Sequence, residues 1–247
     1  MPIFHSLVAP MVSLKTIAFI FARGGSKGVH RKNLREIGGR SLLARSIDVA
    51  RQVPRISRVI ISTDDLEIAE AGKRLGAEVP FMRPQHLATD TAPERLAWRH
   101  AVQWVRENEG PDAIDVFLSL PVTAPLRRAS DVERCLDALQ SSPDCDIVVT
   151  TTAARRNPYF NMVRETPEGL LTLAINDAGK PVRRQDAPTI LDLTCVAYVT
   201  TPGHIMSKDS IFDGRVKGVQ VDEVSAIDID TEFDLTIAEM FARNRDL

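Results

Sequence analysis

A loop rich in glycine and basic residues, RGGSKGVHRKN at residues 23–33, follows the first apolar run of the chain. Gly24, Gly25 and Gly28 would let backbone N–H groups approach a ligand closely and turn toward it. The loop contains neither a Walker A sequence nor GxGxxG, so the usual dinucleotide fingerprint is missing. Its cations can neutralise an anion more highly charged than a carboxylate; they are Arg23, Lys27, Arg31 and Lys32. We expect a polyphosphate ligand here, with an exposed, solvated loop as the alternative.

Two carboxylates near the end of the chain form a second candidate site. Asp228 and Asp230 stand in the sequence IDIDT, and side chains at this spacing on an extended segment point the same way. Both could meet one cation, and hard carboxylate oxygens suit Mg²⁺, with Mn²⁺ as an alternative. Asp230 could instead cap the helix that follows, which is the simpler interpretation of an isolated pair. Asp234 is expected at the surface or behind the metal ligands.

Short apolar runs rich in Val, Ile and Thr indicate strands that are covered on both faces. They are residues 16–22, 58–63, 115–120, 146–152 and 196–201. Helical patterns lie between them, so the sequence predicts an α/β fold with a doubly wound, mostly parallel sheet. Ligands of such sheets bind where strand ends lead into helices, which is where the glycine loop stands. The pattern weakens between about residues 153 and 195, where we expect a small inserted, hairpin-rich lobe.

The helices are predicted from their first residues and from apolar stripes. Residues 41–53 follow Ser41, and residues 65–75 follow Asp64, which we expect to be the N-cap. Three more helices show apolar residues at helical spacing. Their stripes are Trp98, Ala101, Val102 and Val105; Val132, Leu136 and Leu139; and Phe233, Ile237, Met240 and Phe241.

The composition is that of an ordinary globular protein of 247 residues with a formal net charge of -2. This charge gives no reason to expect a nucleic-acid or membrane partner, and no apolar run approaches the roughly 20 residues that cross a bilayer. Cys135, Cys145 and Cys195 have no metal-binding spacing, so we expect buried thiols and a cytoplasmic setting. Residues 1–14 are predicted to be an N-terminal extension of a domain at residues 15–247.

Several motifs in the same order resemble those of the acylneuraminate cytidylyltransferases (CMP-sialic acid synthetases), over about residues 15–241. ARGGSKGVHRKNL at 22–34 is similar to the loop that wraps the triphosphate of CTP in that family. STDDLEIA at 62–69 and RPQHLATDT at 83–91 are similar to a second signature, whose arginine lies by the cytosine base. The implied fold is Rossmann-like, of the nucleotide-diphospho-sugar transferase type. The implied nucleotide contacts are Ala22, Arg23, Gly24, Gly25, Ser26, Lys27, Lys32, Asn33, Arg83, Asp90 and Thr91.

For Asp90 and Thr91, a cap for the next helix is an equally good interpretation. LPVTAPLR at 120–127 resembles LQPTSPLR of the family, which places Thr123 in the site. The departures from the family pattern here are Pro121, Val122 and Ala124. Thr194 and Cys195 replace an Asn-Gly pair beside the expected sugar site.

RRNPYFNMV at 155–163 and RRQDAP at 183–188 resemble segments of the family's lobe. Arginine suits a bidentate contact with the carboxylate of an acidic sugar. The implied sugar contacts are Thr123, Asn157, Tyr159, Phe160, Asn161, Arg183, Arg184 and Gln185. In the family this lobe crosses to a neighbouring subunit, so the resemblance implies a dimerisation lobe and a homodimer whose sites are completed across the interface.

The resemblance also decides between the two interpretations of Asp228 and Asp230 in favour of a metal site. It implies that a sugar hydroxyl attacks the α-phosphate of CTP, with Mg²⁺ bound, and that pyrophosphate leaves. The catalytic residues would be Arg23, Lys27, Lys32 and Asp230. The five histidines are scattered, and no general base can be named.

The implied substrates are CTP and an acidic nine-carbon sugar, N-acetylneuraminate or a related nonulosonate. Kdo, amino-Kdo, pseudaminate and legionaminate are alternative substrates for the same chemistry. A metal-dependent glycosyltransferase is an alternative from another class, because two carboxylates on an α/β nucleotide-binding fold suit one too. A nucleotide-binding homologue without activity is a third possibility.

Overall fold

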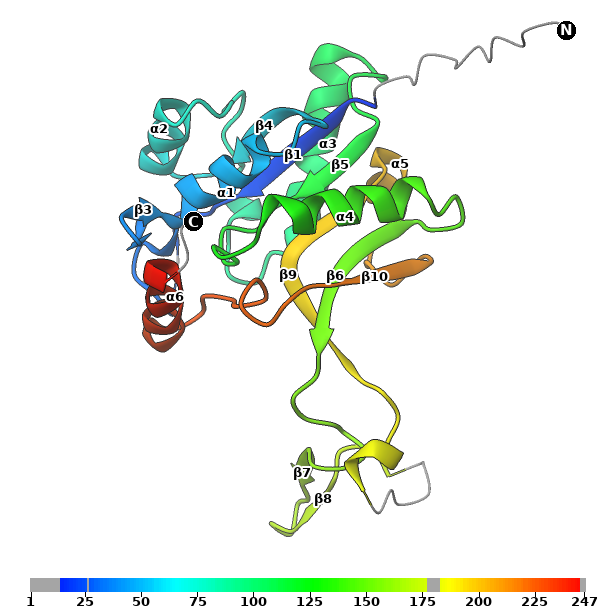
Figure 1. The fold of residues 1–247 in the computed structure, drawn as a ribbon. Coiled ribbons are helices and arrows are strands. Elements are labelled where there is room, and N and C mark those ends of the chain that lie inside the picture. Colours follow the sequence, from blue (N-terminus) through cyan, green and yellow to red (C-terminus); the bar gives the residue numbers. More distant parts are fainter. Residues whose placement is uncertain (1–13, 26, 177–182, 245–247) are drawn as a thin grey trace, which may run out of the picture.

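The computed structural model describes residues 14–25, 27–176 and 183–244, which form a six-stranded sheet flanked by helices (Figure 1). The strands of this sheet are β1 (Thr16–Phe21), β4 (Ile56–Ser62), β5 (Val116–Ser119), β6 (Ile147–Ala153), β9 (Leu191–Thr200) and β10 (Val216–Gln220). Their order is β10-β6-β9-β5-β1-β4. Only β9 runs antiparallel to its neighbours in this sheet. The mostly parallel α/β sheet predicted from the sequence is confirmed.

Helices cover both faces of the sheet. They are α1 (Leu42–Arg51), α2 (Leu66–Arg74), α3 (Glu94–Glu109), α4 (Ala129–Gln140), α5 (Pro202–Ser207) and α6 (Glu232–Asn244). Alternate residues of β1 enter two separate cores, as expected for a strand covered on both sides. Ala18 and Ile20 pack with residues of α1 and α4, whereas Ile17 and Phe19 pack with residues of α3. Helices packed on both faces of the sheet therefore fix the carboxyl end of β1.

Two short turns of 3₁₀ helix lie near the carboxyl ends of the strands: η1 (Lys32–Leu34) and η2 (Gln85–Leu87). A small antiparallel hairpin, β2 (Glu36–Ile37) with β3 (Arg40–Ser41), leads from η1 into α1. Ser41 caps α1, since its hydroxyl accepts a hydrogen bond from the backbone nitrogen of Ala44 at 3.1 Å. The predicted cap of α2 is wrong by one residue: Asp65 is the N-cap, and its carboxylate accepts from Glu67 and Ile68.

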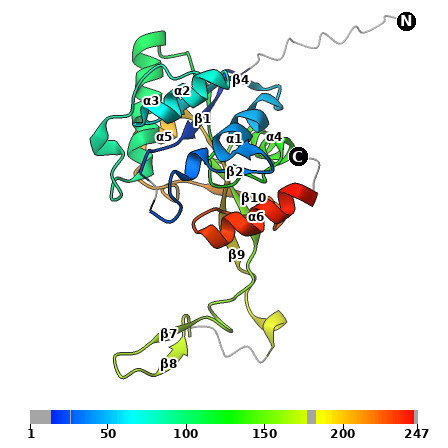
Figure 2. The same ribbon diagram turned by 90° about the vertical axis from the view of Figure 1, so that its left-hand side faces the viewer.

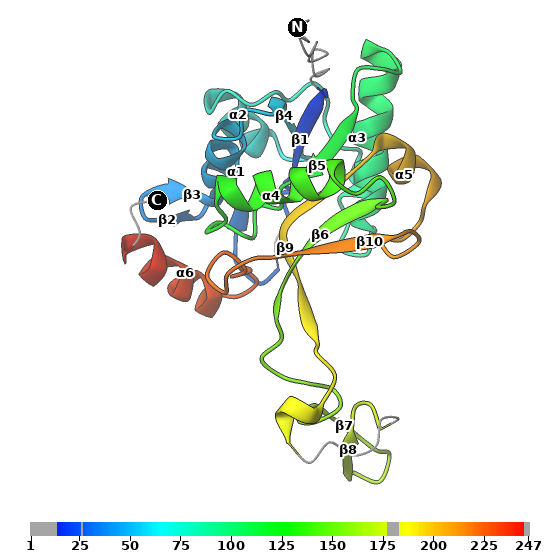
Figure 3. The same cartoon turned by 45° about the vertical axis from the view of Figure 1, so that its right-hand side comes forward.

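Strands β6 and β9 extend beyond the sheet and carry a lobe that contains residues 154–176 and 183–190 (Figures 2 and 3). Of the described residues, the lobe contains the hairpin β7 (Val163–Glu165) with β8 (Leu171–Leu173) and the 3₁₀ turn η3 (Arg184–Asp186). It stands apart from the helices that flank the sheet in both views. One hairpin is thus found among the described residues of the segment where the sequence pattern weakens.

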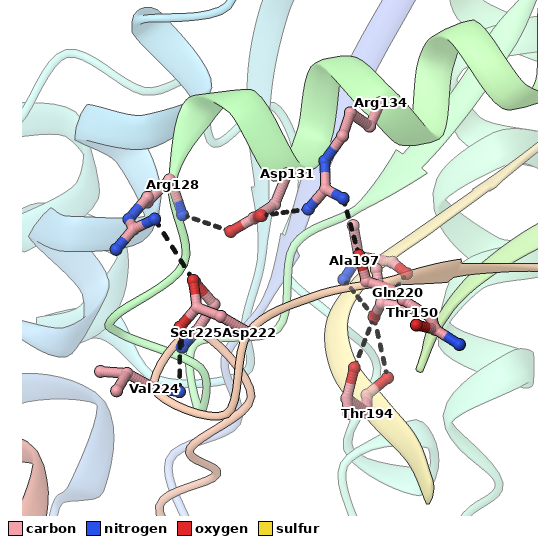
Figure 4. Close-up of polar contacts among 10 residues, drawn as sticks. All are labelled: Arg128, Asp131, Arg134, Thr150, Thr194, Ala197, Gln220, Asp222, Val224 and Ser225. Carbon is pink, nitrogen blue, oxygen red and sulfur yellow. Dashed lines mark hydrogen bonds and ion pairs between the residues drawn. The ribbon is translucent and has the colours of Figure 1, made fainter. Parts of the chain in front are cut away.

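An irregularity in β9 lies where this strand passes the end of the sheet. Val149 pairs with Tyr198, but the next residue, Thr150, pairs with Thr194, so three residues of β9 are looped out. The Thr150 hydroxyl fills this bulge (Figure 4): it accepts from the Thr194 hydroxyl at 2.8 Å and from the Ala197 backbone nitrogen at 3.3 Å. The looped-out segment includes Cys195, which the bulge turns toward the cavity described below.

The apolar stripe predicted for the C-terminal helix does not face the core. In α6 the buried residues are Leu235, Ala238 and Ala242. Phe233 and Met240 are 71% and 60% exposed. The helix is predicted correctly, but the face that packs on the sheet domain is the one with smaller side chains, and the larger apolar face is left outside.

Replacing Thr150 by valine is expected to destabilise the protein by about 1–3 kcal/mol, because the polar groups in the bulge lose their partner. Thr151→Val is a matched control, since the Thr151 hydroxyl is buried without a hydrogen-bond partner among the described residues. That second variant is expected to be neutral or slightly stabilising. Urea unfolding of both variants checks this, and equal losses of stability would contradict the account of the bulge.

Candidate functional site

A cavity of about 550 Å³ lies at the carboxyl ends of β1, β4 and β5. Its wall combines the glycine loop, the segment after β4, the start of α3, the loop after β5, the bulge of β9 and the segment before α6. The lining residues are Phe21, Arg23, Lys27, Gly28, Lys32, Asn33, Arg83, Leu87, Thr89, Asp90, Ala92, Glu94, Pro121, Val122, Thr123, Cys195, Tyr198, Asp228 and Asp230. The two sites predicted from the sequence, the basic loop and the carboxylate pair, therefore face one cavity.

Two hydrogen bonds hold the glycine loop in shape. One lies within the loop, and the other joins the loop to a residue that is distant in sequence. The buried Asn33 donates its side-chain amide to the carbonyl oxygen of Arg23 at 2.8 Å. The backbone nitrogen of Gly24 donates to the Asp64 carboxylate at 3.0 Å. Asp64, predicted as a helix cap, thus anchors the loop instead. Asn33 is a structural clamp of the loop as well as part of the cavity wall.

Two cations of the loop converge on one carboxylate. Asp90 pairs with Arg23 at 2.7 Å and with Lys27 at 2.6 Å. The hydrogen bond from Lys27, followed by that from Arg23, lowers the pKa of Asp90, so this carboxylate stays charged in mild acid. Asp90 does not cap α3, whose N-cap is Pro93. All three groups are partly exposed, and such pairs are worth little net stability, so an incoming anion can replace Asp90 at low cost.

The third cation, Lys32, joins the loop to the carboxylate segment. Its ammonium donates to the carbonyl oxygen of Ile229 at 2.6 Å and to the Asp230 carboxylate at 3.1 Å. The backbone nitrogen of Ile229 donates to the Thr123 carbonyl oxygen at 2.8 Å. Gly28 is in such close contact with this segment that a Cβ atom there would overlap the Asp230 carbonyl oxygen. Three loops therefore meet at Ile229.

Asp230 does not cap α6, because the Thr231 hydroxyl accepts the hydrogen bond from the backbone nitrogen of Asp234 at 3.3 Å. The Asp234 carboxylate accepts hydrogen bonds from the backbone nitrogens of Asp230 and Thr231, at 3.1 Å and 2.7 Å. The side chain of Asp230 is 72% exposed at the cavity. The capping interpretation of Asp230 is therefore wrong, and Asp234 supports the segment from behind.

A polar network at the start of α4 holds the loop that leads from β10 to this segment (Figure 4). Asp131 accepts from the backbone nitrogen of Arg128 at 2.9 Å and pairs with Arg134 at 2.7 Å. Arg128 pairs in turn with Asp222 at 3.3 Å, and Asp222 accepts from the backbone nitrogens of Val224 and Ser225. The position of Asp228 and Asp230 thus depends on helix α4 as well as on the glycine loop.

The carboxylate pair fits a hard cation such as Mg²⁺. Asp228 and Asp230 both line the cavity, and the described residues contain no group of three His, Cys, Asp or Glu side chains placed to hold a metal. Mg²⁺ typically takes one or two carboxylates and completes its octahedron with water and substrate phosphate. A pair of aspartates beside cations that suit a polyphosphate matches this preference.

Three of the five departures from the family pattern line the cavity. Pro121, Val122 and Cys195 line it, and the Cys195 thiol is 3.3 Å from the Thr123 hydroxyl. Burial, and then the charge of Asp228, raise the pKa of Cys195, so it is present as a neutral thiol. The prediction of three buried cysteines is wrong for Cys145 and Cys195, which are half-buried.

Arg127, from the same loop after β5, is fully enclosed and has a structural task. It donates to the carbonyl oxygens of Ala124 at 2.9 Å and Val196 at 2.9 Å, which ties this loop to the bulge of β9. Burial lowers the pKa of its guanidinium.

Not all predicted nucleotide contacts line the cavity. Ala22 is buried and donates its backbone nitrogen to Ser62, and Thr91 is exposed. Gly24 and Gly25 shape the loop without lining the cavity, and Ser26 lies outside the described residues. Lining residues that the sequence analysis missed include Glu94 and Tyr198. Glu94 reads from the sequence as an ordinary acidic residue in the first turn of a helix, so no signal marked it.

The predicted sugar contacts divide between the cavity and the lobe. Thr123 lines the cavity. Asn157 closes a turn in the lobe, where its backbone nitrogen donates to Asn161 at 2.7 Å and its side-chain oxygen accepts from Tyr159. Phe160, Arg183 and Gln185 do not line the cavity of their own chain either. The side chain of Arg184 lies outside the part of the structure that is described. Arg183 pairs with Asp186 at 3.1 Å.

The chain is similar to proteins of known family over nearly its whole length. A family model described as "Cytidylyltransferase" matches residues 17–103. The post-translational flagellin modification protein B of Campylobacter coli is 34% identical over 92% of this chain and 95% of that protein. A CMP-N,N'-diacetyllegionaminic acid synthase of Campylobacter jejuni is 32% identical over the same shares of the two chains. The structure of a CMP-2-keto-3-deoxy-manno-octonic acid synthetase complexed with CTP superposes with a TM-score of 0.70 at 17% identity, covering 93% of this chain and 99% of that one.

The chain therefore belongs to the cytidylyltransferase family, and it is a nucleotidyltransferase. This membership sets aside the alternative of a metal-dependent glycosyltransferase. In the part of the chain that the structure describes, no helix has the length and apolarity needed to span a membrane.

Gly28→Ala is expected to weaken CTP binding by about tenfold or more, because the added methyl group must push the loop away from Asp230. Overpacking of this kind typically costs about 1–3 kcal/mol. Gly203→Ala, in the first turn of α5 and outside this cavity, is the matched control: a Cβ there meets only the Thr201 hydroxyl oxygen, at an ordinary contact distance of 3.8 Å. Isothermal titration with CTP and Mg²⁺ measures both. Equal affinities for the two variants would show that the contact between the loop and Asp230 does not shape the site.

Proposed function

We infer that the protein transfers the cytidylyl group of CTP to an acidic nonulosonic sugar, giving a CMP-sugar and pyrophosphate. The observation that carries this proposal is the single cavity in which Arg23, Lys27 and Lys32 face the carboxylates Asp228 and Asp230. Such a site suits a metal-bound nucleoside triphosphate. Membership of the cytidylyltransferase family supports CTP as the nucleotide. The relatives named for flagellin modification and for legionaminate support a nonulosonate as the sugar.

The proposed reaction is an in-line displacement at the α-phosphorus. The anomeric hydroxyl oxygen of the sugar bonds to the α-phosphorus, the bond to the oxygen bridging to the β-phosphate breaks, and the hydroxyl proton passes to solvent. Mg²⁺ held by Asp228 and Asp230 would supply Lewis-acid polarisation of the phosphate. Arg23 and Lys27 leave Asp90 for the triphosphate. Lys32, fixed by Ile229, stabilises the charge that develops on the leaving pyrophosphate.

The favoured sugar is a di-N-acylated nonulosonate of the legionaminate type, with N-acetylneuraminate, pseudaminate and Kdo as the alternatives. The cavity wall near Thr123 is less polar than the family pattern implies, because Pro121 replaces a glutamine there, while Val122 and Cys195 replace a proline and a glycine. An apolar wall suits an N-acyl group or a methyl group better than the free hydroxyl of Kdo. The test is pyrophosphate release from CTP and Mg²⁺ across a panel of these sugars. Release with a legionaminate-type sugar supports the proposal, and preference for Kdo overturns it.

Asp230→Asn is expected to lower turnover at least about a hundredfold, since the metal loses one of two charged ligands next to the reacting phosphate. The fold should persist, because the side chain is mostly exposed and its pair with Lys32 contributes little stability. Glu232→Gln is the control: it removes a carboxylate two residues away that pairs with Arg35 outside this cavity. Substantial Mg²⁺-dependent pyrophosphate release by Asp230→Asn would remove the metal assignment.

The proposed assembly is a homodimer in which the lobe of one chain completes the site of the other. The lobe residues implied in sugar binding do not line the cavity of their own chain. The lobe and the end of β9 that carries it (its stalk, from Leu191) expose a set of large apolar side chains, as interfaces do before assembly. They are Met162, Val163, Leu170, Leu171, Leu191 and Leu193. The outward face of α6, with Phe233, Ile237 and Phe241, lines a second groove beside the stalk.

Leu171→Asp in the lobe hairpin is expected to shift the protein from dimer to monomer and to lower its activity. Leu66→Asp is the matched control, because Leu66 is 73% exposed, similar to Leu171 at 67%, but lies on α2. Sedimentation velocity of both variants at micromolar concentration gives the answer. A wild-type protein that is active and sediments as a monomer would contradict the proposed assembly.

A further inference from the structure

A second pair of opposite charges, away from the carboxylate pair in sequence, lines the same cavity. Arg83 lies in the segment between β4 and η2, and Glu94 is the first residue of α3. Phe21, at the end of β1, lies beside them, with the Arg83 guanidinium carbon 5.6 Å from the centre of its ring. An arginine offers only donors and a carboxylate only acceptors, so the pair presents a directional pattern to a ligand.

Arg83 is held in place with one edge of its guanidinium already used. Its Nε donates to the Ser62 hydroxyl at 3.1 Å, and Nη2 donates to the Ser62 carbonyl oxygen at 2.6 Å. Stacking on Phe21 fixes the plane of the group. No hydrogen bond among the described residues uses Nη1. This nitrogen is the part of the buried guanidinium that remains for a ligand at the cavity.

Glu94 is fixed in a similar way. Its Oε1 accepts the indole N–H of the buried Trp98 at 3.1 Å, one helical turn later in α3. The other oxygen has no hydrogen bond among the described residues, and the side chain borders the cavity. Protein atoms around the carboxyl raise the pKa of Glu94, while the Trp98 hydrogen bond and then the charge of Arg83 act in the opposite direction. A negative group in the first turn of a 16-residue helix is also favoured by the helix dipole.

Cytosine matches this donor and acceptor pair, and uracil does not. Cytosine carries acceptors at O2 and N3 and a donor in its exocyclic N4 amine, which suit an arginine and a carboxylate respectively. Uracil has a donor at N3 and an acceptor at O4 instead. At the same two positions uracil would face Arg83 with a donor and Glu94 with an acceptor, and each mismatched pair of polar groups loses a hydrogen bond.

We propose that Glu94 is a specificity-determining residue that accepts the exocyclic amine of cytosine and, together with Arg83, selects CTP over UTP. This inference rests on the proposed function, because it places the base of the nucleotide whose phosphates meet the glycine loop. Trp98 is the positioning residue: its indole N–H holds one carboxylate oxygen and directs the other toward the base.

The Trp98 contact makes the outcome of Glu94→Gln specific. The indole N–H requires an acceptor, so the glutamine must turn its amide oxygen toward Trp98 and its NH₂ group toward the base. An NH₂ group opposes the amine of cytosine and suits O4 of uracil. The variant is therefore expected to bind CTP at least about tenfold more weakly than the wild type does, which is the loss typical of one hydrogen bond to a charged group. It is expected to bind UTP more tightly than the wild type does.

Isothermal titration of the full-length protein with CTP, with UTP and with the triphosphate of the pyrimidin-2-one ribonucleoside, all with Mg²⁺, tests the proposal. The third nucleotide keeps O2 and N3 but lacks the amine. Wild type should prefer CTP to it by about tenfold or more, and Glu94→Ala should not distinguish the two. Glu107→Gln on the same helix, whose carboxylate contacts Gln103 on the exposed side, is the control and should match wild type.

Circular dichroism of each variant establishes that it is folded before its affinities are compared. If wild type binds neither CTP nor UTP, the proposed function fails. If wild type prefers CTP but Glu94→Gln and Glu94→Ala keep the wild-type ratios among the three nucleotides, the proposed function stands and the role of Glu94 is overturned.

Discussion

The candidate site depends on one close contact between segments some 200 positions apart in the chain: the glycine loop touches the backbone of Ile229 and Asp230. Only glycine at position 28 allows this approach, and Lys32 fixes it with hydrogen bonds to the Ile229 carbonyl oxygen and to Asp230. The contact brings cations suited to a polyphosphate and carboxylates suited to a divalent cation into one cavity. Each group alone is an ordinary surface feature, and their chemistry follows from this proximity.

The rest of the structure supports that contact from two sides. Helix α4 holds the loop before Asp228 through Arg128 and Asp222 (Figure 4), and the loop after β5 holds Ile229 through the Thr123 carbonyl. The charges of the site are meanwhile satisfied by exposed ion pairs, such as that between Lys27 and Asp90. Exposed pairs are worth little, so a metal-bound triphosphate can replace them without a large penalty. The scaffold is rigid where position matters and weakly paired where a ligand must enter.

The sequence predicted the sheet and most helices because strand and helix periodicities are local properties of the chain. It also predicted the glycine loop and the carboxylate pair, since both are short and chemically marked. It failed where tertiary partners decide. Asp64 and Asp65 are both suitable N-cap residues for α2. Only the folded structure shows that Asp64 instead accepts a hydrogen bond from Gly24 and that Asp65 is the cap. The sequence predicted the apolar stripe of α6, but not that its Phe233 faces outward.

Other features of the site had no signal in the sequence. Cys195 enters the cavity through a bulge in β9 that no local pattern marks, and Glu94 looks like any acidic residue at the start of a helix. The lobe was recognised, but the distance between its residues and the cavity of its own chain appears only in three dimensions. Chemistry that depends on a motif was visible in the sequence, whereas chemistry that depends on a bulge was not.

The central claim is that one cavity binds the whole of a CTP molecule, and the most direct test is a crystal structure of the protein with CTP and Mg²⁺. The account predicts the triphosphate against Arg23, Lys27 and Lys32, a metal held by Asp228 and Asp230, and the cytosine beside Arg83. A nucleotide bound elsewhere, or bound here with its phosphates away from the glycine loop, would contradict it.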